Sequence, residues 1–230
     1  MNNELIQQIK EDYKICVCSL SDREWLYKFT KSMMSVYCKK WGHDFKFVDH
    51  TLDSDRATSW SKLILVKELI LTKKYDYVIW IDDDILLTDE NKDIKDFIDS
   101  NKNIIIQEDP TRKTTNNKRL CYDDINCGFI FFKCDEKTIE IIDKVYMMGE
   151  WLPFKRCRNW EQNVFIKYYN EYDNKDCFDI KPYRTFQSFY RGNNEAYSWI
   201  KGDFSAHYTG IDKEMRLKCI DETLCKINFK

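Results

Sequence analysis

Three consecutive carboxylates, Asp82, Asp83 and Asp84, directly follow an unbroken apolar run at positions 77–81. Such a run is typical of a strand buried on both faces of a parallel sheet, so the acids fall at its carboxyl end. Open α/β sheets bind ligands at that edge. Because side chains alternate in an extended backbone, Asp82 and Asp84 should share one side while Asp83 faces the other. Two carboxylates on one side predict a divalent cation site that keeps positions open for phosphate oxygens.

Two other interpretations of these acids stay open at this point. Three aspartates after a strand also suit a solvated turn, because Asp is a common turn residue. A phosphatase-type strand end, Asp-x-Asp with Thr or Val two positions later, fits less well. Leu86 occupies that later position, and the motif lies in the middle of the chain.

The composition of the 230-residue chain indicates one packed domain. The chain has only 6 Gly and 3 Pro with 15% aromatic residues, and no linker divides it. Its 37 basic and 39 acidic residues are interspersed and give a net charge of -2, so no nucleic-acid partner is expected. The sequence shows no signal peptide and no apolar run of roughly 20 residues. We therefore expect a cytoplasmic protein without a transmembrane segment, lumenal only if the sequence is a trimmed piece.

The ten cysteines are scattered along the chain and include no C-x-x-C pair. This spacing does not indicate a zinc site. We expect mostly reduced, buried thiols, with disulfides as the alternative for a lumenal protein.

The elements that position the acids follow from apolar patterns and from capping residues. The first half alternates strands and helices, which favours β-α-β units and a parallel sheet. The polar segment 109–124 is expected to be a mobile loop bordering the site. Ser21 or Asp22 should cap the first helix, Gly42 should end it, and Ser59 or Ser61 should cap the second. Predicted strands cover 14–19, 45–48, 77–82, 103–107 and 127–132. The first predicted helix ends near residue 41, and four further predicted helices cover 62–72, 91–100, 136–148 and 161–169.

Five motifs in one order carry a family resemblance. They are Trp60-Ser61-Lys62, then Asp82-Asp83-Asp84 with Thr88-Asp89, then Asn126-Cys127-Gly128-Phe129, then Trp160-Glu161-Gln162, and then Gly202-Asp203-Phe204 with His207-Tyr208-Thr209-Gly210. From about Lys14 to about Ile220 the sequence resembles the galactosyl-, mannosyl- and xylosyltransferase family of yeast mannan and plant xyloglucan synthesis. The resemblance implies the GT-A fold, an α/β single domain with a mixed, mostly parallel central sheet flanked by helices. It also implies a nucleotide-sugar donor, a manganese ion and retention of anomeric configuration.

The resemblance implies that Asp82, Asp84 and His207 bind the metal. Independent chemistry agrees, because Mn²⁺ accepts both carboxylate oxygen and imidazole nitrogen, whereas Mg²⁺ favours oxygen alone. Mn²⁺ is therefore expected, with Mg²⁺ as the alternative. A lone histidine near aromatic residues is otherwise a core or surface residue.

The donor site is expected to include residues from both halves of the chain. Lys62 at a helix start should favour phosphate, although a solvated surface lysine is the alternative. Gly128 should let a sugar approach the strand end closely. Asp123 and Asp124 either hold sugar hydroxyls or keep the loop soluble. The resemblance implies a basic residue that meets the diphosphate shortly after the histidine motif. In this chain Asp212 stands at that position and Lys213 follows one position later. The full set assigned to the donor is Ser19, Asp22, Lys62, Asp83, Asn126, Gly128, Gly210 and Lys213.

Glu161 and Gln162 occupy the family positions beneath the transferred sugar. We expect Gln162 to stabilise positive charge at the anomeric carbon and Glu161 to contact sugar or acceptor. A double displacement with Glu161 as nucleophile is one alternative. The other is a helix N-terminus that favours Glu in its first turn.

The sequence therefore predicts a metal-dependent retaining glycosyltransferase that moves a hexose or pentose from a UDP-sugar to a saccharide or glycoprotein hydroxyl. Residues up to about 108 would form the nucleotide-binding half, and the rest would form the sugar and acceptor half. One rival is a sugar-nucleotide-forming nucleotidyltransferase, which needs a Gly-rich loop where residues 18–23 have no glycine. A second rival is a non-catalytic carbohydrate-binding protein on the same fold. The lack of a membrane anchor departs from the eukaryotic members.

Overall fold

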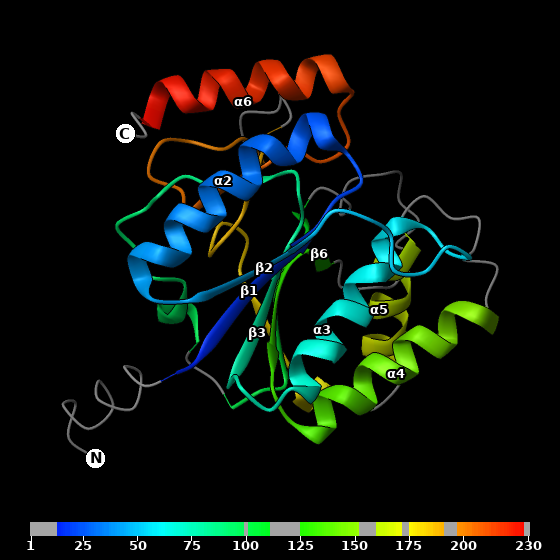
Figure 1. The fold of residues 1–230 in the computed structure, drawn as a ribbon. Coiled ribbons are helices and arrows are strands. Elements are labelled where there is room, and N and C mark those ends of the chain that lie inside the picture. The colour runs from blue at the N-terminus through cyan, green and yellow to red at the C-terminus, as the bar shows by residue number, and fades with distance from the viewer. Residues whose placement is uncertain are drawn as a thin grey trace, which may run out of the picture.

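A computed structural model describes residues 13–98, 101–110, 125–151, 160–171, 175–190 and 197–227, with Trp151 and Trp160 described by their backbone alone. Figure 1 shows the arrangement of the helices and strands. The strands are β1 (Ile15–Leu20), β2 (Asp44–Val48), β3 (Tyr77–Ile81), β4 (Ile85–Leu87), β5 (Ile104–Glu108), β6 (Ile125–Lys133), β7 (Phe178–Lys181), β8 (Ser188–Phe189) and β9 (Ser205–His207). The helices are α2 (Glu24–Trp41), α3 (Ser61–Leu71), α4 (Glu136–Trp151), α5 (Trp160–Glu171) and α6 (Lys213–Ile227), with short 3-10 turns η1 (Thr58–Trp60), η2 (Ile94–Phe97) and η5 (Lys175–Cys177).

The central sheet has six strands in the order β2-β1-β3-β6-β5-β7. Strand β1 runs parallel to β2 and β3, and β5 runs parallel to β7. Strand β6 lies between β3 and β5 and is antiparallel to both. Five strands therefore share one direction, which confirms the predicted α/β class with a mixed, mostly parallel sheet.

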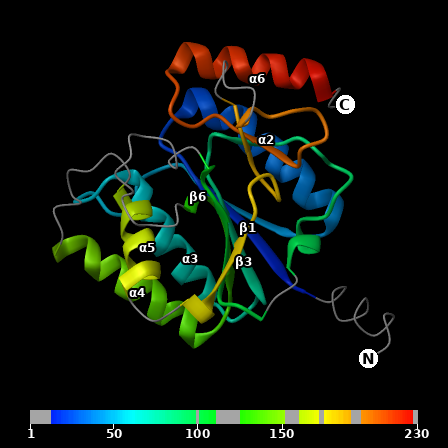
Figure 2. The same cartoon turned by 180° about the vertical axis from the view of Figure 1, so that it is seen from behind.

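Helices cover both faces of this sheet, as Figures 1 and 2 show. Val78 and Trp80 of β3 belong to the core cluster that includes residues of α3, α4 and α5. Tyr77, Ile79 and Ile81 point to the other face and pack in a cluster with residues of α2. Successive side chains of β3 point to opposite faces of the sheet, and both faces are covered, so every side chain of the strand is buried. This explains why its sequence is continuously apolar.

A second, three-stranded sheet has the order β4-β9-β8. Strand β4 is antiparallel to β9, with Ile85 opposite His207. Strand β8 is parallel to β9, with Phe189 opposite His207. Helix α6 packs with α2 in a third apolar cluster that includes Leu86 of β4 and Ala206 of β9. The small sheet therefore fixes the C-terminal part of the chain beside the end of β3.

The expected N-caps of α2 and α3 differ from the observed ones, although both helices form nearly where they were predicted. The Ser21 hydroxyl accepts from Arg23 N at 3.0 Å in the turn before α2 and does not cap the helix. The Ser61 hydroxyl accepts from Leu52 N at 2.9 Å and holds the preceding loop. Gly42 ends α2 with φ of 74°, as predicted, because this left-handed conformation suits glycine.

The helix predicted over 91–100 is wrong, since the described part of this segment contains only the short turn η2. The side chain of Asp93 accepts from Lys95 N and so caps the turn. Ile94 and Phe97 are buried in the core that also contains residues of α2. Ile98 is buried in the same core, but its backbone already leaves the helical conformation, so the three apolar residues anchor a single turn.

Other expectations about the whole chain have mixed outcomes. Most of the predicted loop, residues 111–124, lies outside the described residues, as do Asp123 and Asp124. The cysteines of the described part of the chain are free thiols, as expected for a reduced protein. Among the described residues, no helix has the length and apolar character that crossing a bilayer requires.

Candidate metal and donor site

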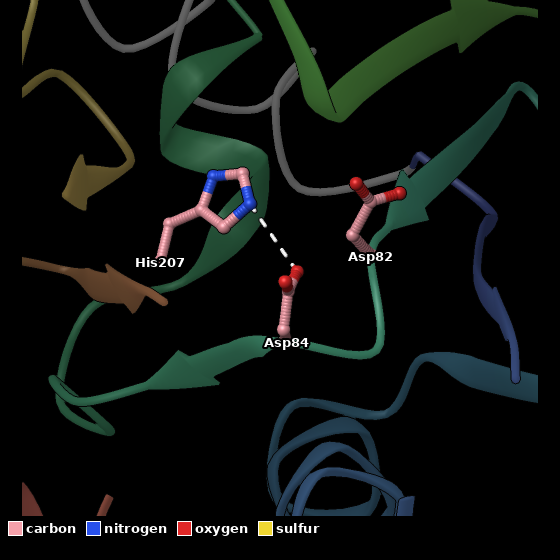
Figure 3. A group of neighbouring side chains, drawn as sticks. All are labelled: Asp82, Asp84 and His207. Atoms are coloured by element: carbon pink, nitrogen blue, oxygen red, sulfur yellow. Dashed lines mark ion pairs between the residues drawn. The ribbon is translucent and has the colours of Figure 1, made fainter. Parts of the chain in front are cut away.

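The turn between β3 and β4 brings the predicted metal ligands together. Asp82 N donates to Gly128 O at 2.7 Å, and Ile85 N donates to Asp82 O at 3.1 Å, which closes a tight turn over the three acids. Asp84 O accepts from Tyr208 N at 2.9 Å, so the backbone beside His207 is fixed to this turn. One ligand atom each from Asp82, Asp84 and His207 lies within 4.8 Å of the others. Figure 3 shows the three side chains.

The donor atoms of this group fit a divalent cation. His207 Nδ1 lies 3.0 Å from Gln187 Oε1, and a carbonyl oxygen can only accept, so Nδ1 carries a proton. In the ring form that donates from Nδ1, the Nε2 lone pair faces Asp84 Oδ1, 3.2 Å away. Two acceptors at this distance favour a cation between them. Ligands of one ion at bond lengths of about 2.1 Å lie at most about 4.2 Å apart, which is close to the spread of these atoms.

Burial and charge distinguish the two carboxylates of the site. The Asp82 side chain is 29% exposed and opens the site to solvent, whereas Asp84 and His207 are buried. Burial raises the pKa of Asp82 despite the opposing charge of Lys62. Burial also acts to raise the pKa of Asp84, but the adjacent His207 and the charges of Arg23 and Arg216 outweigh it and hold that pKa below its usual value. Asp84 is therefore the more firmly ionised anchor.

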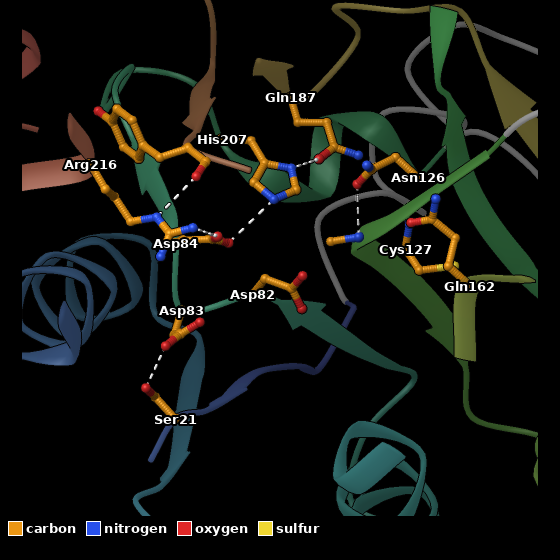
Figure 4. A network of polar contacts seen from close by, with 12 residues as sticks. Ser21, Asp82, Asp83, Asp84, Asn126, Cys127, Gln162, Gln187, His207 and Arg216 are labelled. Carbon is orange, nitrogen blue, oxygen red and sulfur yellow. Dashed lines mark hydrogen bonds and ion pairs between the residues drawn. The ribbon is translucent and has the colours of Figure 1, made fainter. Parts of the chain in front are cut away.

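Asp83 points away from the other two acids, as the strand alternation predicts. Its carboxylate accepts hydrogen bonds from the Ser21 hydroxyl and from Arg23 Nε, the latter at 3.0 Å. Burial and the charge of Asp84 raise the pKa of Asp83 to about 6, against the opposing effect of Arg23. These contacts fix the connection between β1 and α2. Figure 4 shows Asp83 directed toward Ser21 and away from the metal group.

Lys62 lies at the start of α3, as expected, and its side chain is buried. Its side chain is 1% exposed, so it is not a solvated surface lysine. Its ammonium contacts Glu161 Oε1 at 2.7 Å, Cys127 O at 2.8 Å and Asp82 Oδ1 at 3.2 Å. These three acceptors match its three N–H groups, and the assignment of Lys62 to a donor phosphate stays a prediction. Burial acts to lower the pKa of Lys62, but the charges of Asp82 and Glu161 raise it.

The start of α5 is joined to an irregular part of β6. The pairing of β5 with β6 shifts register after Ile106, so residues 127–129 have no partner on β5. Side chains replace those partners, because Gln162 Oε1 accepts from Cys127 N at 3.0 Å and Asn126 Oδ1 accepts from Gly128 N at 2.9 Å. The candidate catalytic pair therefore lies beside the strand end, and Lys62 links it to Asp82. Figure 4 shows Gln162 beside Cys127 and Asn126.

Gly128 is required at its position for a reason other than the expected one. A Cβ there would lie 2.5 Å from His207 Cε1 and 3.0 Å from Asn126 Oδ1. Real Cβ atoms do not approach so closely, so the imidazole fills the space that a side chain would need. The ring, rather than a donor sugar, occupies the space above Gly128.

Ser19 and Asp22 lie at the end of β1 and in the turn that follows it. Ser19 is buried, and within the described part of the chain its hydroxyl has no hydrogen-bond partner. Asp22 is exposed and accepts from Thr58 Oγ1 at 2.9 Å, which connects this turn to η1. Their assignment to base and ribose stays a prediction.

The segment after His207 forms the start of α6. Gly210 has φ of 73°, which allows the sharp turn between β9 and the helix. The Asp212 carboxylate accepts from Met215 N at 2.8 Å and so caps α6. Lys213 is exposed, with Nζ 5.2 Å from the centre of the Trp25 ring. The position of the family basic residue is therefore a helix cap in this chain.

Sequence reasoning missed three residues of the site, namely Arg23, Gln187 and Arg216. Arg216 is buried on α6, with one guanidinium nitrogen 3.4 Å from Asp84 Oδ2 and Nε donating to Tyr208 O at 3.0 Å. Helix α6 carries many charged residues, and nothing in its pattern separates Arg216 from the solvated ones. Only the docking of α6 shows that this cation supports Asp84.

Neither a protein-family model nor a curated protein sequence matches the chain. Among solved structures, the chain is similar to a glycosyltransferase involved in the glycosylation of the major capsid of PBCV-1. The TM-score is 0.70 at 17% sequence identity, and the match covers 92% of this chain and 99% of that one. This likeness shows that the chain has the fold of that glycosyltransferase.

Proposed function

We propose that this protein is a metal-dependent retaining glycosyltransferase that moves a hexose or pentose from a UDP-sugar to a saccharide or glycoprotein hydroxyl. The observation that carries the proposal is the convergence of Asp82, Asp84 and His207 at the carboxyl end of β3, in a chain with a glycosyltransferase fold. A bound Mn²⁺, which suits this mixed oxygen and nitrogen set, would neutralise the diphosphate as a Lewis acid. The half up to about residue 108 would hold the nucleotide, and the remainder would hold sugar and acceptor.

The chain's own residues prepare the ligand set before any donor binds. Asp84 is oriented by Arg216, and His207 is held by Gln187, so both enter the site with fixed geometry. Asp82 is more open, and its Oδ1 accepts from Trp80 Nε1 at 2.6 Å as well as from Lys62. A preorganised set of this kind requires little movement when a cation and diphosphate arrive.

We assign Gln162 to the reaction centre and Glu161 to its support. Gln162 is partly exposed, and its carbonyl oxygen uses one lone pair for Cys127 N, which orients the other. That lone pair can face positive charge at the anomeric carbon. Glu161 is buried against Lys62, which favours an electrostatic role over nucleophilic attack. In the transfer itself, the acceptor oxygen bonds to the anomeric carbon as the bond to phosphate breaks, and the acceptor proton passes to a departing phosphate oxygen.

Donor hydrolysis tests the proposal directly. The purified protein is incubated with UDP-glucose, UDP-galactose, UDP-xylose or GDP-mannose, with Mn²⁺, Mg²⁺ or a chelator, and nucleotide release is measured. We expect UDP release from at least one donor with Mn²⁺ and none with the chelator. Asp84→Asn and His207→Ala should each reduce the rate by about 100-fold or more. Lys218→Ala, on the exposed face of α6, should leave it unchanged.

The same experiment separates this function from a binding role. A carbohydrate-binding protein would release no nucleotide from any donor, and that result would contradict the proposal. Once a donor and an acceptor are known, the anomeric configuration of the product, read from its proton coupling constants, tests retention. An inverted product would contradict the assignment of Gln162.

A further inference from the structure

A buried glutamine, Gln187, contacts the candidate metal ligand His207 on the side away from Asp84. Its Oε1 lies 3.0 Å from His207 Nδ1, while Nε2 of the same ring faces Asp84. The whole Gln187 residue is buried. Figure 4 shows the ring between the two side chains. The Gln187 carbonyl oxygen is therefore placed where it can accept from a proton on Nδ1 of the ring.

The backbone around Gln187 is anchored by side chains rather than by strand pairing. Gln107, at the end of β5, accepts from Phe186 N at 3.0 Å and from Gln187 N at 3.1 Å. Its amide nitrogen donates to Gln187 O at 2.8 Å. The Ser205 hydroxyl donates to Phe186 O at 2.7 Å. Because these groups are buried, the segment before β8 has a fixed position relative to the ring.

Packing restricts the ring but does not choose between its two orientations. Gly128 lies directly against Cε1 and Nδ1, and the Phe189 ring meets the imidazole edge to face at 5.7 Å. These contacts are nearly insensitive to which nitrogen bears hydrogen. A hydrogen-bond acceptor at Nδ1 is sensitive to it, since only one tautomer can donate there.

The Gln187 amide also has a buried donor group that costs free energy because it lacks a hydrogen-bond partner in the described part of the chain. Its Nε2 is buried and, among the described residues, has no hydrogen-bond partner. Buried donors without partners are rare and call for an explanation. The partnered atom of the amide is its acceptor oxygen, which meets His207 Nδ1.

We propose that Gln187 is a positioning residue that holds His207 in the tautomer whose Nε2 lone pair faces a bound cation. This inference depends on the metal site of the proposed function and extends it to a residue that contacts neither metal nor donor. Partners of this kind commonly change metal affinity 10- to 100-fold when they are removed. Removing the Gln187 acceptor should therefore weaken Mn²⁺ binding by about that factor.

The test is direct Mn²⁺ binding to the donor-free full chain, followed by the electron paramagnetic resonance signal of the free ion. Gln187→Met keeps the length of the side chain and removes the acceptor, whereas Gln187→Glu keeps an acceptor. Ser188→Ala is the matched control, because Ser188 is a buried neighbour whose hydroxyl has no hydrogen-bond partner in the described structure. Circular dichroism and thermal unfolding without metal establish that each variant is folded.

We expect Gln187→Met to bind Mn²⁺ about 10- to 100-fold more weakly than the wild type, and Gln187→Glu and Ser188→Ala to bind within about threefold. If Gln187→Met binds as tightly as the wild type, or Gln187→Glu is equally impaired, the positioning role is overturned. If Gln187→Met does not fold, Gln187→Asn replaces it, since its shorter amide cannot reach Nδ1, and the same two outcomes decide. Wild-type protein that binds no Mn²⁺ would instead overturn the metal site of the proposed function.

Discussion

The Lys62 ammonium lies 2.7 Å from the Glu161 carboxylate, and this buried ion pair joins the start of α3 to the start of α5. Lys62→Met should lower the free energy of unfolding by about 3–5 kcal/mol, because it leaves Glu161 buried without its counter-charge. Urea unfolding followed by circular dichroism measures the change. Combining Lys62→Met with Glu161→Leu should recover much of the loss, since the second change removes the stranded charge.

The exposed pair of Lys67 and Asp143 provides the control for this prediction. Its side chains are 35% and 46% exposed, so Lys67→Met should cost less than about 1 kcal/mol. If the two lysine substitutions have equal effects, Lys62 does not act through a buried charge, and its proposed support of the site is wrong.

Gly128→Ala should weaken metal binding and also lower the free energy of unfolding. The new methyl group would meet His207 Cε1 at 2.5 Å, so the ring must move away from Asp84. Overpacking of this kind costs about 1–3 kcal/mol. Gly149→Ala is the matched control, because its methyl would meet Trp60 at 2.2 Å in the packing of α4, away from the acids. We expect both variants to unfold at lower urea, but only Gly128→Ala to lose Mn²⁺ affinity. Equal affinities would show that the ring tolerates displacement.

Local patterns were sufficient to predict most of the fold. The continuous apolar run of β3 indicated burial on both faces, and Gly42 marked the end of α2. These signals work because each depends on neighbours within a few positions. The prediction for segment 91–100 was wrong because its conformation is not set locally. It depends on the core that Ile94 and Phe97 enter rather than on their spacing.

The site residues that come from one strand end could be predicted from the sequence. Those that come from distant segments of the chain could not. Asp82 and Asp84 follow from strand alternation, whereas His207 required the family resemblance. The burial of Lys62 and the contact of Arg216 with Asp84 arise from how α3, α5 and α6 pack. No periodicity in the sequence carries that information.

The buried thiols should be unreactive in the native protein. Burial raises the pKa of Cys16 to about 11 and that of Cys38 to about 12, so at pH 8 almost no thiolate forms at either. Cys225 is exposed and should react rapidly with dithionitrobenzoate. Cys225→Ser should remove one fast equivalent, and the slow thiols should appear only on unfolding. Rapid reaction of Cys16 or Cys38, located by peptide mapping, would contradict the burial of these thiols.

The pair formed by His43 and Asp93 should make stability depend on pH in the acid range. Their side chains are 5% and 3% exposed, and the ring Nε2 lies 2.8 Å from Asp93 Oδ1. Burial acts to raise the pKa of Asp93, but hydrogen bonds from His43 and Lys95 N lower it below the ordinary value of 3.8. A lowered folded-state pKa adds stability that is complete above 3.8 and is lost as the pH falls toward the folded-state pKa.

Asp93→Asn should therefore cost about 1.5–3 kcal/mol at pH 7, the range for hydrogen bonds to charged groups. The difference from the wild type should stay constant down to about pH 5 and shrink below pH 4. Urea unfolding at a series of pH values measures it. Asp49→Asn is the control, because the contact of Asp49 with His50 is exposed and screened. The free energy of unfolding of this variant should therefore differ much less from that of the wild type at every pH. A gap for Asp93→Asn that does not change between pH 7 and pH 3.5 would show that the carboxylate charge does not hold η2 against α2.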